Sequence, residues 1–425
     1  MRRTLAVTGA AFALLLVAPV AASAAPGTPS TPAVRTAASD LVRSKEYWLS
    51  SYGILQAWNT TQGRGVTVAI IDTGVDGSVP ELRGAVVGGT DFSHHGASNG
   101  QTPVGSGEDS DHGTMVASLL AGRGTGPGTG AIGVAPQASL LSISIGFGAQ
   151  APDSDDQIAD AVTWAVDHGA RVINMSLTRN TLSWPPSWDK AFLYAEQHDV
   201  VVVAAAGNRG SGTDEVGAPA TMPGVLTVAG VDESGRASDD ASSQGVTIGV
   251  AAPSVDLVSV VPGGGYVLWD GTSGSTPIVA GAVALVRAAH PELSAADVIQ
   301  RIIATARDRG ARGDDPIYGY GLLDANAAVN ADVPTVKANP LGSLKDWVAL
   351  HRPADAATGP VWTSRVPMPS TAPAPHVRDP VGVLLPSPTT LRLVGIPALV
   401  VLLALFVAVG FVVGTVRYFG GRRSR

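Results

Sequence analysis

The stretch Ala69–Gly77 reads AIIDTGVDG and places an Asp-Thr-Gly tripeptide directly after an apolar run. Three interpretations of Asp72 are open: half of an aspartic-protease dyad, the carboxylate of another hydrolytic triad, or a turn residue that ends a strand. A dyad needs two carboxylates that share one proton, usually from two copies of the tripeptide. The chain carries one copy, and a homodimer that supplies the second would suit a much smaller chain. The dyad is therefore disfavoured, and the rest of the sequence must decide between the other two.

Short apolar runs alternate with helical patterns between Trp48 and about Ala328. The runs are continuous and rich in β-branched residues, which is typical of strands buried on both faces; they cover residues 66–71, 139–145, 172–177, 200–206 and 225–231. Helical patterns begin near Ser154, with two aspartates in the first turn, and at Ser294, which suits an N-cap. This alternation predicts an α/β fold with a mostly parallel central sheet flanked by helices.

The bulk composition excludes several classes of protein. Hydrophobic residues make up 45% and charged residues 15% of the 425 residues, so we expect a folded or membrane-linked chain and not a disordered one. The net charge of -7 argues against nucleic-acid binding, which usually needs a basic patch. The chain has no cysteine, which rules out disulfides, thiolate metal ligands and a cysteine nucleophile.

Both ends of the chain carry membrane signals. Residues 1–24 combine two arginines, an apolar run and an Ala-Ser-Ala end, which is typical of a secretory signal peptide. Residues 25–45 then form a short N-terminal extension, too small for an independently folded pro-domain. Residues 393–416 contain no charged residue and would extend about 36 Å as a helix, enough to cross a hydrocarbon core.

The segments around this expected span predict its orientation. Residues 331–391 are rich in proline and lose apolar periodicity, which indicates a semi-extended linker. Residues 417–425 are rich in arginine, so the positive-inside rule puts this tail in the cytoplasm. We therefore expect a single-pass protein of the cell membrane whose folded domain is extracellular.

Three further motifs place polar side chains at the ends of the expected elements. The sequence DSDHGTMVASLLAG puts His112 at the start of a helix. The sequence DGTSGSTPIVAGAVALVRAAHP puts Ser273 where a loop becomes a helix, whose unpaired N–H groups point toward a developing anion. The sequence VVVVAAAGNRG ends a strand beside Asn208. Taken alone, His112 is equally well explained as a helix cap or surface residue, Ser273 is better explained as an ordinary cap, and Asn208 is commonly a turn former.

Taken together with Asp72, the motifs closely resemble those of the subtilisin-like serine proteases, in that family's order of Asp, His and Ser. The resemblance covers about residues 46–330, the expected peptidase domain, and implies a three-layer fold. It implies that Ser273 is the nucleophile, that His112 is its base and that Asp72 orients His112. Asn208 would donate its side-chain N–H to the tetrahedral oxyanion, alongside the backbone N–H of Ser273. Asp72 is thus identified as a triad carboxylate.

The resemblance also implies a substrate cleft. The sequence NMSL is similar to the strand that pairs with an extended peptide substrate, and the end of the AAAG run is similar to the floor and wall of the S1 pocket. The substrate-binding residues expected on this basis are Ser176, Leu177, Thr178, Ala205, Ala206 and Gly207. Thr178 stands where many relatives have glycine, so its side chain should narrow the pocket edge and make the enzyme selective.

No metal ion or cofactor is expected. Many secreted relatives have a calcium-binding loop after the helix of His112, but the loop GRGTGPGTGAIGVAP offers almost no side-chain oxygen beyond threonine hydroxyls. Hard cations prefer about six to eight oxygen ligands. His94 and His95 have no third ligand in view and are interpreted as part of a polar loop.

The acidic residues that precede His112 allow two interpretations. Glu108, Asp109 and Asp111 could simply form a solvated loop. Alternatively, they favour basic residues in the substrate and raise the pKa of His112.

The whole architecture is similar to that of the mycosins, membrane-anchored subtilases linked to type VII secretion in actinobacteria. The resemblance implies an extracellular serine endopeptidase that cleaves polypeptides, processes selected secreted proteins and contacts the type VII secretion machinery. The lack of cysteine is a departure, since mycosins generally carry disulfides. Two alternatives remain: a scaffold that stabilises a secretion complex, with proteolysis secondary, and an anchored degradative protease.

Overall fold

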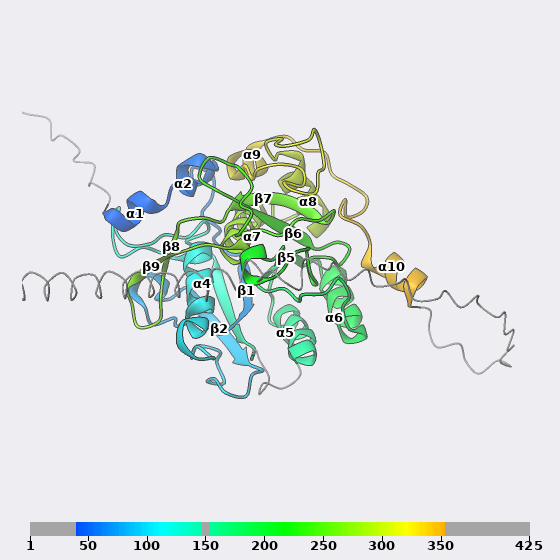
Figure 1. Cartoon of the computed structure of the whole chain (residues 1–425). Coiled ribbons are helices and arrows are strands. Elements are labelled where there is room, and N and C mark those ends of the chain that lie inside the picture. The colour runs from blue at the N-terminus through cyan, green and yellow to red at the C-terminus, as the bar shows by residue number, and fades with distance from the viewer. Residues whose placement is uncertain (1–39, 147–153, 353–425) are drawn as a thin grey trace, which may run out of the picture. The chain divides into compact units, whose positions relative to one another are not determined.

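A central sheet of seven strands organises the folded part of the chain. The computed structural model describes residues 40–146 and 154–352 (Figure 1). The strand order is β2-β3-β1-β4-β5-β6-β7, and each neighbouring pair is parallel. The strands are β1 (Thr67–Asp72), β2 (Val86–Asp91), β3 (Ser139–Ser144), β4 (Val172–Met175), β5 (Val201–Ala205), β6 (Leu226–Val231) and β7 (Ile248–Pro253). The expected α/β fold with a parallel central sheet is confirmed.

The five strands expected from the sequence are the inner strands of the sheet, and the two edge strands escaped prediction. Every position of β4, β5 and β6 is buried, which explains their continuous apolar sequences. Edge strand β2 reads VVGGTD and is partly exposed. At Gly89 the backbone of β3 is so close that a Cβ would lie 2.1 Å from the carbonyl oxygen of Ser142. In the sequence, such a glycine resembles a turn signal although it marks a close backbone contact.

Helices cover the sheet because its buried strands need apolar partners on both faces. Helix α4 packs against α7, and α5 packs against α6 (Figure 1). Helix α7 contacts the strands from β4 to β7 and is buried along most of its length. The helices are α4 (His112–Ala121), α5 (Ser154–Asp167), α6 (Pro186–Gln197), α7 (Thr272–Ala289) and α8 (Ala295–Ala304). Helix α8 begins at the expected cap, where Ser294 and Asp297 form a capping box.

Short elements complete the domain. Strands β8 (Leu257–Val260) and β9 (Tyr266–Trp269) form an antiparallel hairpin that leads into α7. The remaining elements are α1 (Leu41–Lys45), α2 (Trp48–Ser51), α3 (Ile54–Ala57), η1 (Pro80–Leu82), η2 (Gly107–Asp111), η3 (Arg209–Ser211), α9 (Ala325–Asn330) and α10 (Leu344–His351). Helix α1 belongs to the expected N-terminal extension, so the end of that extension is part of the fold.

The packed part of the chain continues beyond residue 330. Helix α10 lies inside the segment expected to be a linker and packs against α6. Arg352 follows α10; its Nε lies 2.9 Å from Asp189 Oδ2, and its Nη2 donates to the carbonyl oxygen of Trp184 at 2.7 Å. The first part of the expected linker, up to residue 352, is therefore packed on the domain.

Three sequence-based expectations lie outside the described residues: the signal peptide at 1–24, the span at 393–416 and the tail at 417–425. Among the helices of residues 40–146 and 154–352, none is long and apolar enough to cross a membrane.

Candidate active site

Asp72 and His112 meet at the carboxyl end of the sheet, where side chains from neighbouring parallel strands gather. Asp72 is the last residue of β1, and His112 is the first residue of α4. His112 Nδ1 lies 2.8 Å from Oδ1 and 3.0 Å from Oδ2 of Asp72. Asp72 is buried and accepts a further hydrogen bond from the backbone N–H of Thr73 at 2.7 Å. The carboxylate is thus fixed and can hold the imidazole in one orientation.

The two motifs that carry these residues interlock. The Thr73 hydroxyl accepts from the Gly113 N–H at 3.0 Å, and the Thr114 hydroxyl accepts from the Asp76 N–H at 3.0 Å. A Cβ on Gly113 would lie 2.2 Å from the carbonyl oxygen of Gly74. The threonines and glycines of Asp-Thr-Gly and His-Gly-Thr therefore fasten the start of α4 to the end of β1.

The surroundings of His112 shift its acidity. Burial alone would lower the pKa of His112, but the charge and hydrogen bond of Asp72, together with the charge of Asp109, outweigh burial and raise this pKa above its usual value. The ring also meets Trp269 edge to face, with ring centroids 5.7 Å apart. The sequence analysis did not single out Trp269, although its position just before the Asp-Gly-Thr-Ser motif could have drawn attention to it.

Ser273 lies in the first turn of α7 and is bonded to the segment that follows β4. Its hydroxyl donates to the carbonyl oxygen of Ser176 at 3.1 Å, and the Ser176 hydroxyl donates to the carbonyl oxygen of Ser273 at 2.8 Å. Asn174 Nδ2 in turn donates to the Ser176 hydroxyl at 3.0 Å. Within the described part of the chain, the Ser273 hydroxyl thus bonds to Ser176 and not to His112. The sequence analysis placed Asn174 only in the NMSL segment expected to pair with substrate and did not expect its contact with the Ser176 hydroxyl.

Asn208 is fixed by its oxygen end. Its Oδ1 accepts from the backbone N–H of Thr272 at 2.8 Å and lies 2.8 Å from the Thr272 hydroxyl. The amide is therefore oriented with Nδ2 as its remaining donor. A Cβ on Gly271 would lie 2.9 Å from Nδ2, and the φ angle of 140° at Gly271 also favours glycine. Gly271, which has no side chain, thus leaves room for Asn208 Nδ2.

A cleft of about 660 Å³ opens beside Asp72 and His112. The lining residues are Asp72, Thr73, His95, Val104, Gly105, Ser106, Asp109, His112, Met115, Gly146, Ser176, Leu177 and Thr178. The expected substrate residues Ser176, Leu177 and Thr178 are thus brought together with the Asp–His pair. Ala205, Ala206 and Gly207 are buried at the end of β5 and do not line this cleft.

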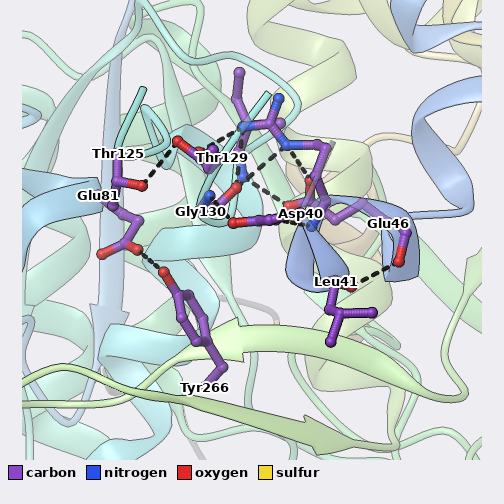
Figure 2. Close-up of polar contacts among 11 residues, drawn as sticks. Asp40, Leu41, Glu46, Glu81, Thr125, Thr129, Gly130 and Tyr266 are labelled. Atoms are coloured by element: carbon purple, nitrogen blue, oxygen red, sulfur yellow. Dashed lines mark hydrogen bonds and ion pairs between the residues drawn. The ribbon is translucent and has the colours of Figure 1, made fainter. Parts of the chain in front are cut away.

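The N-terminal segment holds the glycine-rich loop, residues 122–136, that follows α4. The Arg43 guanidinium donates to the carbonyl oxygens of Thr129 at 3.2 Å and Gly130 at 3.0 Å. Asp40 accepts from the Gly130 N–H at 2.9 Å, as Figure 2 shows. In this loop, where the sequence predicts no calcium ion, the Arg43 guanidinium therefore binds two of the carbonyl oxygens. Among the described residues, no group of three or more His, Asp or Glu could hold a metal ion, and His94 and His95 join none.

Glu46 completes this attachment. It lies beside the same loop, where its Oε1 accepts from the Ile132 N–H at 2.6 Å and its Oε2 lies 2.8 Å from Arg43 Nε. Burial raises the pKa of Glu46 to about 8, although the Ile132 N–H and the charge of Arg43 act in the opposite direction. The far end of α4 is therefore tied to a buried carboxyl group.

Comparison with known proteins decides the family. The profile of the Subtilase family matches residues 63–321, which is more than half of the chain. The chain belongs to the subtilase family. This subtilase is 34% identical over 325 residues to fervidolysin of Fervidobacterium pennivorans, covering 69% of this chain and 45% of that protein. It is 37% identical over 270 residues to subtilisin E of Bacillus subtilis (strain 168), covering 63% and 66%. The subtilase thus spans less than two thirds of either relative.

Solved structures narrow the comparison. The subtilase is similar to MycP1 from the ESX-1 type VII secretion system, with a TM-score of 0.58 and 31% identity, over 70% of this chain and 88% of that chain. This likeness supports the mycosin branch of the family. This subtilase has no cysteine and therefore no disulfide, which remains a departure from the mycosins.

Proposed function

We propose that this subtilase is a serine endopeptidase in which Asp72, His112 and Ser273 act as a catalytic triad. The observation that carries the proposal is the contact of half-buried His112 with buried Asp72, joined at 2.8 Å beside a cleft that Ser176, Leu177 and Thr178 also line. Ser273 is hydrogen-bonded to the same segment. Asp72, His112 and Ser176 come from three distant parts of the sequence and line one cleft, and Ser273 is bonded to Ser176; a purely structural role would not require this arrangement.

The reaction follows from the chemistry of these groups. When a peptide is bound, the Ser273 hydroxyl exchanges its bond to the Ser176 carbonyl for one to His112 Nε2. Catalytic hydrogen bonds often form only in the substrate complex. His112 accepts the proton as Ser273 Oγ attacks the peptide carbonyl, and then gives that proton to the leaving amine. Water hydrolyses the resulting acyl-enzyme by the same steps, while Asp72 stays ionised.

The oxyanion of the tetrahedral intermediate needs donors that are already in place. The Asn208 amide is oriented by Thr272 through its Oδ1, so Nδ2 is the donor that the proposal assigns to the oxyanion. The backbone N–H of Ser273, in the first turn of α7, is the second donor.

We further propose that the enzyme is anchored in the cell membrane by residues 393–416, with the catalytic domain outside. The charge-free run and the signal-like N-terminus support this. The likeness to MycP1, a protein of the ESX-1 type VII secretion system, supports a role in processing selected secreted proteins. Thr178 at the cleft supports a restricted set of substrates.

Active-site labelling tests the proposal. The full chain, purified in detergent, is treated with a fluorophosphonate probe, which reacts with an activated serine. The wild type should be labelled, and Ser273→Ala should not. Ser50→Ala, which removes an exposed hydroxyl on α2, is the matched control and should be labelled like the wild type. An unlabelled wild type, or a labelled Ser273→Ala variant, would contradict the proposal.

A scaffold role is the second candidate, favoured by the likeness to a component of a secretion system. Secretion that survives Ser273→Ala but is lost when the gene is deleted would assign the main role to the scaffold. Rapid digestion of casein would instead favour a general degradative enzyme over a selective one.

A further inference from the structure

The wall of the cleft is apolar with one unpaired carboxylate. Val104, Met115 and Leu177 supply its larger apolar side chains, and no lysine or arginine is among its described lining residues. Its two carboxylates are Asp72 and Asp109. The Asp72 carboxylate is hydrogen-bonded to His112, so the Asp109 carboxylate is the one that can bind a charged group of a ligand.

Asp109 differs from its acidic neighbours. Its side chain is exposed, and it makes no hydrogen bond or ion pair with another residue in the described part of the chain. Asp111 lies 3.4 Å from the Ser110 hydroxyl and is not among the lining residues. Of these two aspartates that precede His112, only Asp109 therefore faces the cleft.

An apolar wall with a carboxylate suits one class of side chain. Lysine and arginine lay an aliphatic stem along apolar surface and keep their charged head group in a polar environment. In this cleft, the stem would lie on Val104, Met115 and Leu177, and the head group would meet Asp109. A glutamate in the same place would meet a like charge, and a short apolar residue would leave the carboxylate without a partner.

We propose that Asp109 is a specificity-determining residue that selects a lysine or arginine of the substrate, close to the scissile bond. The inference rests on the proposed peptidase function and adds the chemical class of substrate. An exposed ion pair contributes at most about 1 kcal/mol, so the preference for a basic residue over an uncharged one of equal length is at most about fivefold. The preference should weaken with added salt, because exposed charges are screened.

Peptide cleavage by the full chain in detergent tests the proposal. Quenched fluorescent peptides, scanned at each position on both sides of the cleaved bond, locate the position with the largest preference. At that position, lysine is compared with norleucine, its uncharged analogue, and with glutamate. The wild type should cleave the lysine peptide with a kcat/KM higher than that of the norleucine peptide by up to about fivefold, and the glutamate peptide should be poorest.

Two variants assign the preference to Asp109. Asp109→Asn should bring the lysine-to-norleucine ratio close to one, and Asp109→Lys should reverse the order so that glutamate is favoured over lysine. The matched control is Asp111→Asn, which removes the same charge two residues away and should keep the wild-type ratio. Comparing ratios within each variant removes any general change in activity.

The outcomes separate this inference from the function on which it rests. Norleucine peptides cleaved as well as lysine peptides at every position, or a preference that persists in Asp109→Asn and Asp109→Lys, would overturn the role of Asp109 while leaving the peptidase intact. A wild type that cleaves no peptide and takes no fluorophosphonate label would overturn both.

Discussion

The two ends of α4 are built by different means. At its start, the side chains and glycines of two short motifs hold His112 against Asp72, within 40 positions of the chain. At its end, the loop 122–136 is held by Asp40, Arg43 and Glu46, which come from an N-terminal segment nearly 90 positions away. The first end is built for chemistry and the second for attachment. Substitutions at the first should therefore change the reaction, and substitutions at the second should change stability.

The largest effect is expected at Asp72. Asp72→Asn keeps the shape of the side chain and can still accept from the Thr73 N–H, but an amide favours the wrong tautomer of His112. We expect kcat to fall about 10⁴-fold, as for the same exchange in another Ser-His-Asp protease. The assay is hydrolysis of a peptide substrate at saturation, with circular dichroism as the check on folding. A loss below tenfold in a folded variant would remove Asp72 from the mechanism.

A smaller loss of kcat is expected on substitution of Gly271, which lies beside Asn208. An alanine Cβ would lie 2.9 Å from Asn208 Nδ2 and should displace this amide. The expected loss in kcat is about 10²- to 10³-fold, the range for removing one oxyanion donor in a related subtilisin. Gly169→Ala is the control for placing alanine at a glycine with positive φ, since its φ is 80° and no atom lies within 4 Å of the added Cβ. Gly271→Ala and Asn208→Ala should not add in the double variant, because both remove the same donor.

These contacts also show what the sequence could and could not predict. Asp72 and His112 stand in short motifs with fixed neighbours, and the inner strands are continuous apolar runs, so the sequence could predict both the Asp72–His112 contact and these strands. The catalytic roles of Ser273 and Asn208 remain predictions from their motifs. Strand β2 was not, because close packing against β3 requires the glycines that normally signal a turn. Arg43 and Glu46 carry no local signal for the loop that they hold. Trp269 does stand next to the Asp-Gly-Thr-Ser motif, but its contact with His112 is created by the hairpin β8–β9, which the sequence analysis did not predict.

A substitution at Arg43 tests the role of the contacts that hold the loop 122–136 at the end of α4. Arg43→Met keeps an apolar stem but removes the donors to the carbonyl oxygens of Thr129 and Gly130, and leaves Glu46 without its cation. We expect a loss of about 1–3 kcal/mol in the free energy of unfolding, seen as a Tm lowered by several degrees, with kcat at 25 °C changed less than twofold. Arg236→Met is the control, because Arg236 and Asp232 form an ion pair at the surface. Its loss should hardly change the Tm.

The same variant can contradict the view that the end of α4 affects stability and not the reaction. An Arg43→Met protein with a wild-type Tm and a much lower kcat would mean that the loop acts on His112 through α4 and not on stability. A chelator tests the loop separately: it should leave the Tm of the wild type unchanged, since a guanidinium already faces the carbonyls of Thr129 and Gly130. A large drop would reveal a bound cation.

The last prediction concerns the change of stability with pH at Glu46. Its pKa is about 8 in the folded protein and 4.5 for the ordinary side chain, so the folded state holds this proton more tightly than the unfolded state. The resulting stability is fully present below pH 4.5 and is lost as the pH rises toward 8, by at most about 1.4 kcal/mol per pH unit. Glu46→Gln can still accept from the Ile132 N–H and does not titrate. The Tm of the variant minus that of the wild type should therefore rise from pH 4.5 to 8 and level off above it, because all other groups titrate in both proteins. A difference that stays flat over this range would mean that Arg43 keeps Glu46 ionised throughout, and that the attachment end is an ordinary ion pair.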